Sequence, residues 1–275
     1  MPDVKIIFPV IVLYRTHLRE AQTYRTLLCN DSFTHFMIYD NSPEDHIVDT
    51  RLLDRRAVYV RDTKNSGLSH AYNYAGAYAR QEGYTHLLIL DQDTTFPPHA
   101  AEVYQNIAST CPLSAPSLHI GEKRPFSPVD VKGWTLKGVC LPPGEYPLTR
   151  FSPVNSGICV RLDLFNQAGG YDENVKLDYA DFVFSRRLSP YHSVFRLLPF
   201  VAHQDFSDNV TDTVQLLRRL RLYLNSATNI RTTSFMEKAK IVYQTFRHTL
   251  SIGFRTRSLS PLTSYVRHFI LKHPI

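Results

Sequence analysis

The sequence predicts an α/β protein with a mostly parallel central sheet flanked by helices. Short apolar runs alternate with helical patterns through residues 6–91, and this alternation is typical of such sheets. Three of the apolar runs end in polar turns. The chain has 275 residues, 43% hydrophobic and 20% charged. It is therefore long enough to bury a full core, and its composition excludes a disordered protein.

Each expected element rests on a run of apolar residues with a recognisable period. Strands are expected at 6–14, 36–39, 57–60 and 87–90, and helices at 17–29 and 69–81. Residues 111–153 are rich in Pro and Gly and are expected to form an irregular loop of the kind that binds ligands. Trp134 in this loop either stacks on a sugar or anchors the loop. A strand is then expected at 154–160, and helices from Arg161 and over 182–188.

The strand over residues 87–90 stops at two carboxylates, Asp91 and Asp93. In open α/β sheets, ligands bind beyond the carboxyl ends of the parallel strands. No basic residue is near the pair in sequence, so burying both charges is costly unless a cation neutralises them, and such oxygen ligands suit Mg²⁺ or Mn²⁺. The structural alternative is that one aspartate caps the turn before Pro97 and Pro98.

Other polar turns are expected at the same edge of the sheet. Tyr14-Arg15-Thr16 follows the first strand and Asp40-Asn41-Ser42 follows the second. The segment from Asn65 to Asn73 joins them, and the backbone N–H groups that start its helix are available to an anion. A metal beside such donors suits a diphosphate. The glycine patterns of Rossmann dehydrogenases and of P-loop NTPases are both absent from the sequence.

A second acidic cluster, Asp178-Tyr179-Ala180-Asp181, precedes the helix expected over 182–188. Asp181 falls at the start of this helix. It is either an N-cap whose carboxylate accepts a backbone N–H, or a general base that faces the same pocket as Asp93. The spacing alone leaves both open.

The order of these motifs resembles family 2 inverting glycosyltransferases of the GT-A fold, especially the rhamnosyltransferase-like branch of bacterial polysaccharide biosynthesis. The motifs are Tyr14-Arg15-Thr16, Asp40-Asn41-Ser42, Asn65-x-Gly67 with Asn73, Leu90-Asp91-Gln92-Asp93-Thr94, Asn155-Ser156-Gly157, Gly169-Gly170-Tyr171-Asp172-Glu173, and Asp178-Tyr179-x-Asp181 with Arg186. They cover residues 6 to about 205. The resemblance implies a Rossmann-like GT-A domain over 1–215, with a nucleotide-sugar half over about 1–110 and an acceptor half over about 111–215.

The resemblance also implies roles for individual residues. Asp181 corresponds to the catalytic base. Asp93 corresponds to a direct metal ligand, with Asp91 and His203 completing the site for Mn²⁺ or Mg²⁺. Asp40 corresponds to the acid that contacts the nucleotide base or ribose. The remaining implied nucleotide-binding residues are Thr16, Asn65, Gly67, Asn73, Asp91 and Arg186.

The activity implied by this resemblance is transfer of a sugar, with inversion, from a UDP- or dTDP-linked donor. The acceptor is a hydroxyl of a glycan or lipid-linked molecule in O-antigen or capsule synthesis. Two alternatives are a catalytically silent carbohydrate- or membrane-binding module and a nucleotidyltransferase. The second would need a glycine-rich, lysine-bearing loop near residues 14–20, and the sequence has none there.

The C-terminal segment, 216–275, is expected to be a basic helical extension. From Arg218 onward it contains eleven Lys and Arg residues and one acidic residue, Glu237, a net charge of +10 within a chain of +6. Interleaved apolar residues suggest a surface for an anionic membrane, the alternative being a solvated helical face packed on the core. No nucleic-acid recognition motif supports a nucleic-acid partner.

The cellular setting is predicted from the cysteines and the N-terminal residues. The four cysteines have no metal-type spacing and are expected to be reduced thiols. The apolar run near the N-terminus is too short for a signal peptide or a membrane span. We therefore expect a cytoplasmic protein, peripheral at the inner face of the cell membrane.

Overall fold

A ten-stranded mixed sheet dominates the structure, a computed structural model that describes residues 6–121, 123–205 and 213–271. Its strands are β1 (Ile7–Leu13), β2 (Phe36–Asp40), β3 (Ala57–Arg61), β4 (His86–Asp91), β5 (Thr94–Thr95), β6 (Leu113–Ile120), β7 (Arg124–Ser127), β10 (Gly144–Pro147), β12 (Cys159–Arg161) and β13 (Val194–Gln204). The main strand order is β10-β13-β6-β12-β4-β1-β2-β3.

The N-terminal half of the sheet is parallel, as predicted. β1 pairs with β2 on one side and with β4 on the other. The register sets Leu13 beside Asp40 and Val12 beside Asp91, so the carboxyl ends of the three strands lie next to one another. This arrangement gathers the three polar turns at one edge.

The two faces of the sheet are buried by different helices, because side chains alternate along each strand. Phe8, Val10 and Val12 of β1 pack in a cluster with α1 (Leu68–Gln81), α3 (Leu162–Gln167) and α4 (Ala180–Leu188). Ile11 and Leu13 pack on the other side with α2 (Ala100–Ala108) and the short helix η2 (Tyr24–Leu28). The predicted class, a mostly parallel sheet flanked by helices, is confirmed.

The prediction of an irregular loop over residues 111–153 is wrong. β6 lies in the middle of the sheet, parallel to β13 and antiparallel to β12. Its sequence, LSAPSLHI, interrupts the apolar pattern with Ser114, Pro116 and Ser117, yet most of the strand is buried. The same region also forms a small sheet from β8 (Val129–Asp130), β9 (Lys137–Gly138) and β11 (Phe151–Ser152). The strand expected at 154–160 begins only at Cys159, because Asn155 to Gly157 form a turn.

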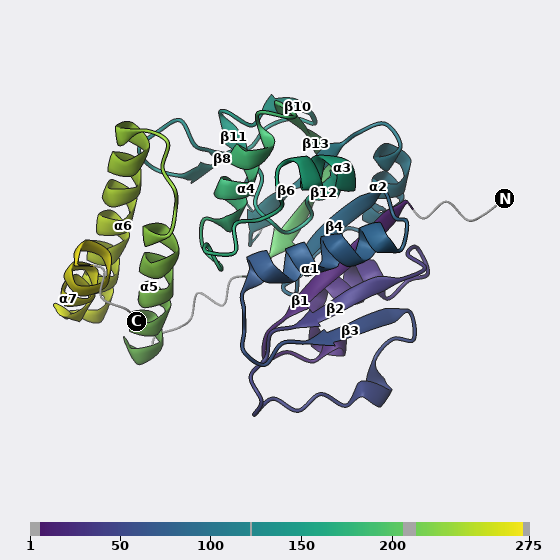
Figure 1. The fold of residues 1–275 in the computed structure, drawn as a ribbon, viewed down its shortest axis with the longest axis horizontal. Helices are drawn as coiled ribbons and strands as arrows, with labels where there is room; N and C mark the ends of the chain where they lie inside the picture. The colour runs from purple at the N-terminus through teal and green to yellow at the C-terminus, as the bar shows by residue number, and fades with distance from the viewer. Residues whose placement is uncertain (1–5, 122, 206–212, 272–275) are drawn as a thin grey trace.

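The C-terminal segment is helical, as predicted. It contains α5 (Thr213–Thr228), α6 (Phe235–Thr256), α7 (Ser260–Ser264) and the single-turn helix η4 (Tyr265–Ile270). These helices stand together beside α4, away from β1, β2 and β3 (Figure 1). They share a small core of Leu220, Leu224, Ile252 and Tyr265, while Ala227 joins the core of the main sheet. In the described part of the chain, no helix combines the length and apolarity needed to cross a membrane.

Candidate active site

The turns that follow β1, β2 and β4 are joined by hydrogen bonds. The backbone N–H of Tyr14 donates to Oε1 of Gln92 (2.8 Å), and that of Arg15 donates to Oγ of Ser42 (2.7 Å). Arg15 has a positive φ of 51°, a left-handed conformation that occurs mostly in turns. The predicted gathering of polar turns is therefore present, and it forms one edge of the candidate site.

Asp91 and Asp93 lie at this edge and share one hydrogen-bond donor. Nε2 of Gln204 is 3.1 Å from Oδ1 of Asp93 and 3.5 Å from Oδ2 of Asp91. Tyr72 of α1 also donates its hydroxyl to Oδ1 of Asp91 (3.0 Å). Both aspartates are half-buried. The carboxylate pair is thus held from α1 on one side and from β13 on the other.

The electrostatics of this pair are unfavourable without a cation. Burial raises the pKa of Asp91, and the charge of Asp93 raises it further, while burial also raises the pKa of Asp93. The hydrogen bonds from Tyr72 and Gln204 oppose these shifts for Asp91 but do not cancel them. Raised pKa values mean that the protein disfavours two negative charges here.

The residues present fit a divalent cation. Oε1 of Gln204 is buried and has no hydrogen-bond partner, and it belongs to the same amide that contacts both carboxylates. Two carboxylates and an amide oxygen are hard oxygen ligands suited to Mg²⁺ or Mn²⁺, which complete their coordination with water or substrate phosphate. Within residues 6–121, 123–205 and 213–271, no group of three His, Cys, Asp or Glu side chains is close enough to hold a metal.

His203 does not join the carboxylate pair, contrary to the expectation that it completes the metal site. Its side chain is exposed, and Nδ1 lies 2.9 Å from the carbonyl oxygen of Gly121. Consecutive side chains of a strand point to opposite faces, so Gln204 reaches the aspartates and His203 points away. Sequence reasoning missed Gln204, although this period-two alternation along β13 is the signal that distinguishes the two residues.

Asp181 lies in the first turn of α4, not at the N-cap, which is Tyr179. Its Oδ1 accepts the backbone N–H of Phe182 (2.9 Å). Burial raises the pKa of Asp181 to about 7, and the charges of Asp178 and Asp91 contribute to the rise. A carboxyl group with a pKa near neutrality, affected by the charge of Asp91 at the end of β4, has the properties of a general base.

Asp40 is fixed at the end of β2 and is only 1% exposed. Oδ1 accepts the backbone N–H of Ser42 (2.9 Å), and Oδ2 accepts the hydroxyl of Tyr59 (2.8 Å). Nearby, the hydroxyl of Thr16 donates to the carbonyl oxygen of Tyr14 (3.2 Å). Asp40 and Thr16 are therefore both at the edge expected for the nucleotide.

The segment before α1 makes a tight turn at two predicted residues. Asn65 has a φ of 50° and Gly67 a φ of 104°. Gly67 is buried against the segment at Lys176, where an added Cβ would lie 2.7 Å from the Lys176 Cβ. Only glycine fits this combination of backbone angle and close approach.

The resemblance implies that Asn73 binds the nucleotide, but in the structure its side chain makes hydrogen bonds within the protein. Its Nδ2 donates to the carbonyl oxygen of Tyr171 (3.0 Å) and to Glu173 (2.9 Å), and its Oδ1 accepts the backbone N–H of Tyr171 (2.8 Å). The side chain therefore links α1 to the segment that leads to α4, and its hydrogen-bonding groups are already used inside the protein.

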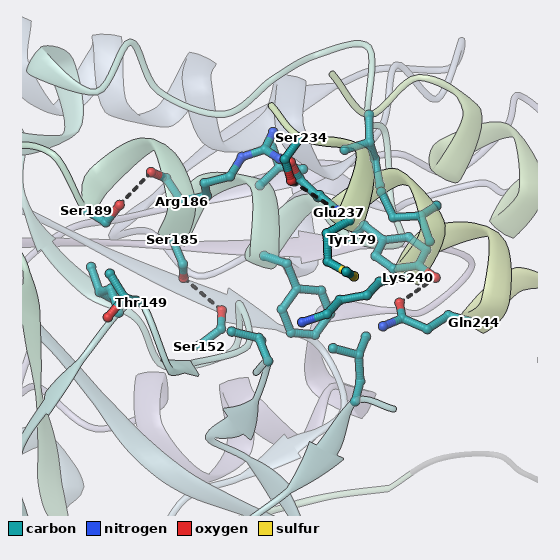
Figure 2. Close-up of a pocket in the computed structure, with 18 residues that line it drawn as sticks. Thr149, Ser152, Tyr179, Ser185, Arg186, Ser189, Ser234, Glu237, Lys240 and Gln244 are labelled. Atoms are coloured by element: carbon teal, nitrogen blue, oxygen red, sulfur yellow. Dashed lines mark hydrogen bonds and ion pairs between the residues drawn. The ribbon is translucent and has the colours of Figure 1, made fainter. Parts of the chain in front are cut away.

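Arg186 also lies apart from the carboxylate pair, contrary to the expectation that it binds the donor. It forms an ion pair with Glu237 of α6, and Nη2 donates to the carbonyl oxygen of Arg231 (2.7 Å). These contacts border a cavity of about 410 Å³ between α4, α6 and the loop around Thr149. Figure 2 shows Arg186 directed toward Ser234 and Glu237 at this cavity.

The cavity combines apolar walls with several hydroxyl groups. Tyr179, two residues before Asp181, and Phe182, the residue after it, contribute to its lining. Ser152 and Ser185 are joined by a hydrogen bond of 2.9 Å, and Tyr179 donates to Gln244 (3.4 Å) (Figure 2). An apolar pocket with a few convergent polar groups is typical of a small-molecule site.

Comparison with known proteins shows the fold. The structure is similar to that of GalNAc-T7 with UDP, GalNAc and Mn²⁺, with a TM-score of 0.59 and 12% sequence identity, over 99% of this chain and 58% of that one. This likeness identifies the fold as GT-A. The chain thus spans less than two thirds of the length of GalNAc-T7 in that structure.

Two further solved structures give lower scores. The mannosyltransferase PcManGT from Pyrobaculum calidifontis, in complex with GDP-Man and Mn²⁺, has a TM-score of 0.49 and 11% identity over 98% of this chain and 76% of that one. The structure of residues 1–349 of S. aureus TarS has a TM-score of 0.49 and 13% sequence identity, over 97% of this chain and 88% of that one. No family model and no curated protein matches the sequence.

Proposed function

We propose that this protein is a metal-dependent, inverting glycosyltransferase that uses a nucleotide-diphosphate sugar, either UDP- or dTDP-linked, as its donor. The observation that carries the proposal is the pairing of a carboxylate pair suited to a cation with a separate carboxyl group, Asp181, whose pKa is about 7. The GT-A fold and the UDP and Mn²⁺ bound to GalNAc-T7 support it.

The donor site is assigned to the edge formed by β1, β2 and β4. Asp40 and Thr16 lie where the nucleoside would bind, and Asn65 and Gly67 form the turn that would close over it. Mn²⁺ or Mg²⁺, held by Asp91, Asp93 and the amide oxygen of Gln204, would stabilise the charge of the leaving diphosphate. Asn73 supports this site by fixing α1 to the segment before α4.

Asp181 acts as the general base in this proposal. Its carboxylate takes the proton of the acceptor hydroxyl while that oxygen forms a bond to the anomeric carbon of the donor sugar. The bond from this carbon to the diphosphate oxygen breaks at the same time, which inverts the anomeric configuration. Proton transfer to a positioned base contributes roughly 10²- to 10⁴-fold to the rate.

The acceptor is a hydroxyl of a glycan or a lipid-linked molecule, as in O-antigen or capsule synthesis. The cavity between α4 and α6 supports this assignment, because Phe182, the residue after the base, lines it, and because the apolar walls of the cavity suit an amphipathic molecule. The proposed location is the cytoplasm, peripheral at the inner face of the cell membrane. The rhamnosyltransferase-like branch remains a proposal for the donor sugar.

Thermal unfolding with nucleotides tests the donor site. Among UDP, dTDP, GDP and CMP, we expect UDP or dTDP to raise the melting temperature, only when Mn²⁺ is present, and Asp93→Ala to abolish the rise. Asp172→Ala, a carboxylate removed outside the pair, is the matched control and is expected to keep it. The absence of a shift with every nucleotide would instead favour a catalytically silent binding module.

A further inference from the structure

The outward face of α6 carries exposed apolar side chains, and the described structure covers them only in part, through Trp134 on Tyr243 and Tyr265 on Phe246. We propose that this face binds an anionic lipid bilayer directly. We define the outer face as Phe235, Val242, Tyr243 and Phe246, with Lys238 and Arg247 at its margins. The inference rests on the proposed membrane location but not on glycosyl transfer, so it is testable without nucleotide or acceptor.

The geometry of α6 separates a buried face from an exposed apolar face. Thr245, Thr249 and Ile252 are buried, and Ile252 packs with Leu220 and Leu224 of α5 and with Tyr265 of η4. Phe235, Val242 and Phe246 recur at the spacing of one helix face and are exposed, Phe235 to 85% and Phe246 to 43%. A hollow of about 600 Å³ lies on this face, between Phe235, Phe246 and Tyr265. The helix is already packed on the protein through its buried face, so the exposed apolar face marks an interaction site.

Charge identifies the partner as an anionic surface. Lys238 and Arg247 border the outer face, and within residues 213–271 neither has a carboxylate partner. Glu237, the only acidic residue of this segment, is instead paired with Arg186 on the side facing α4. Cations at the margin of exposed aromatic residues match the headgroup region of an anionic bilayer, where the apolar face enters the acyl boundary.

The same charge argues against a second copy of this chain as the partner. The segment from Arg218 onward has a net charge of +10, and a symmetric dimer through α6 would place two such segments face to face. A bilayer that contains acidic lipids compensates these charges instead.

Trp134 supplies a built-in probe of this contact. It is the only tryptophan of the chain and is 49% exposed. Its ring packs edge-on against Tyr243 with 5.7 Å between ring centroids, and its carbonyl oxygen accepts a hydrogen bond from Gln244. Trp134 therefore lies beside the outer face, and its fluorescence reports whether that face enters an apolar environment.

The experiment is sedimentation of the full chain with vesicles of phosphatidylcholine, with or without phosphatidylglycerol, at low and high salt. We expect binding only to vesicles that contain phosphatidylglycerol, a blue shift of Trp134 emission, and release by salt. Phe246→Ser is expected to weaken binding roughly tenfold or more, and removal of Lys238 or Arg247 roughly fivefold each.

Matched variants remove equivalent side chains elsewhere. Ile47→Ser removes another exposed apolar residue, and Arg55→Glu another exposed cation. Both are expected to bind as the wild type does. Phe235→Ser replaces Phe246→Ser if the latter lowers the melting temperature, because Phe246 also contacts Tyr265.

Three results would overturn the inference. These are equal binding of neutral and anionic vesicles, unchanged binding of both the Phe235 and Phe246 variants, or a dimer in light scattering that these variants dissociate while vesicles are not bound. A nucleotide-dependent rise in melting temperature together with no vesicle binding would reject membrane binding by the outer face. The proposed glycosyl transfer would be unaffected.

Discussion

Arg219 of α5 holds the carboxylate of Asp178, three residues before the candidate base, through both terminal guanidinium nitrogens. Nη2 lies 2.6 Å from Oδ1, and Nη1 contacts Oδ2. The next residue, Tyr179, has a φ of 66° and its hydroxyl contacts that of Tyr223, also on α5. The C-terminal helices therefore fix the turn from which Asp181 projects.

This contact predicts that Arg219→Lys lowers kcat more than it lowers stability. Lysine keeps the positive charge but cannot make the bidentate contact with Asp178. The turn that carries Asp181 is then positioned less well, and kcat is expected to fall roughly tenfold. The loss of stability stays within about 1 kcal/mol because half of the Arg219 side chain is exposed. Turnover and melting temperature are compared with those of Arg218→Lys, which alters a neighbouring exposed arginine. Equal turnover of the two variants would contradict the positioning role.

Variants of Gln204 and His203 test which of these two adjacent residues supports the metal site. The structure indicates Gln204, whereas the sequence predicted His203. Gln204→Leu removes the amide shared by Asp91 and Asp93, so Mn²⁺ affinity measured by calorimetry is expected to fall at least tenfold. His203→Ala removes an exposed ring on the opposite face of β13 and is expected to leave the affinity unchanged. If His203→Ala is the more damaging variant, the assignment of the metal ligands is wrong.

Asp91→Asn is expected to stabilise the metal-free protein at alkaline pH. The folded-state pKa of Asp91 is raised above its ordinary value of 3.8. Its contribution to stability is therefore present at low pH and is lost as pH rises through the folded-state pKa. Asparagine stays neutral, and its amide oxygen still accepts the hydroxyl of Tyr72.

The test compares the melting temperatures of wild type and Asp91→Asn at about pH 5 and pH 8 in the presence of a chelator. A difference of about 1 kcal/mol in the free energy of unfolding corresponds to roughly 2–4 °C. The variant should be the more stable protein at both pH values, with the larger advantage at the higher pH, because the carboxyl is already ionised in the unfolded state at about pH 5. Added Mn²⁺ should stabilise only the wild type. A variant that melts earlier than wild type at the higher pH would show that the carboxylate is already neutralised in the metal-free protein.

Asp181→Asn is expected to reduce kcat roughly 10²- to 10⁴-fold without changing the nucleotide-induced shift in melting temperature. For the wild type, kcat should rise with pH through about 7, because the base is active only when ionised and burial raises its pKa to about 7. The pH profile of Asp172→Asn serves as the control. A flat wild-type profile from about pH 6 to 8 would exclude Asp181 as the base.

The sequence predicted the parallel half of the sheet because its strands are continuous apolar runs with polar turns at their ends. It did not predict β6, since burial of Ser114 and Ser117 depends on pairing with β12 and β13, which no local pattern reveals. The site residues follow the same division. Asp91 and Asp93 end a strand and are visible locally, whereas the facing direction of Gln204 requires the register of β13.

Gly67 shows how a local backbone angle and a distant segment combine at the donor site. Its φ of 104° is unfavourable for any other residue, and a Cβ at this position would lie 2.8 Å from the carbonyl oxygen of Lys176. Gly67→Ala is therefore expected to cost about 1–3 kcal/mol of stability and to displace the start of α1 from the 172–176 segment.

Gly83→Ala is the matched control, because Gly83 also has a positive φ, of 81°, but an added Cβ there would meet no atom within 4 Å. Denaturant unfolding and nucleotide binding should show a larger loss for Gly67→Ala in both measurements. Equal losses would mean that the contact with Lys176 contributes nothing beyond backbone strain.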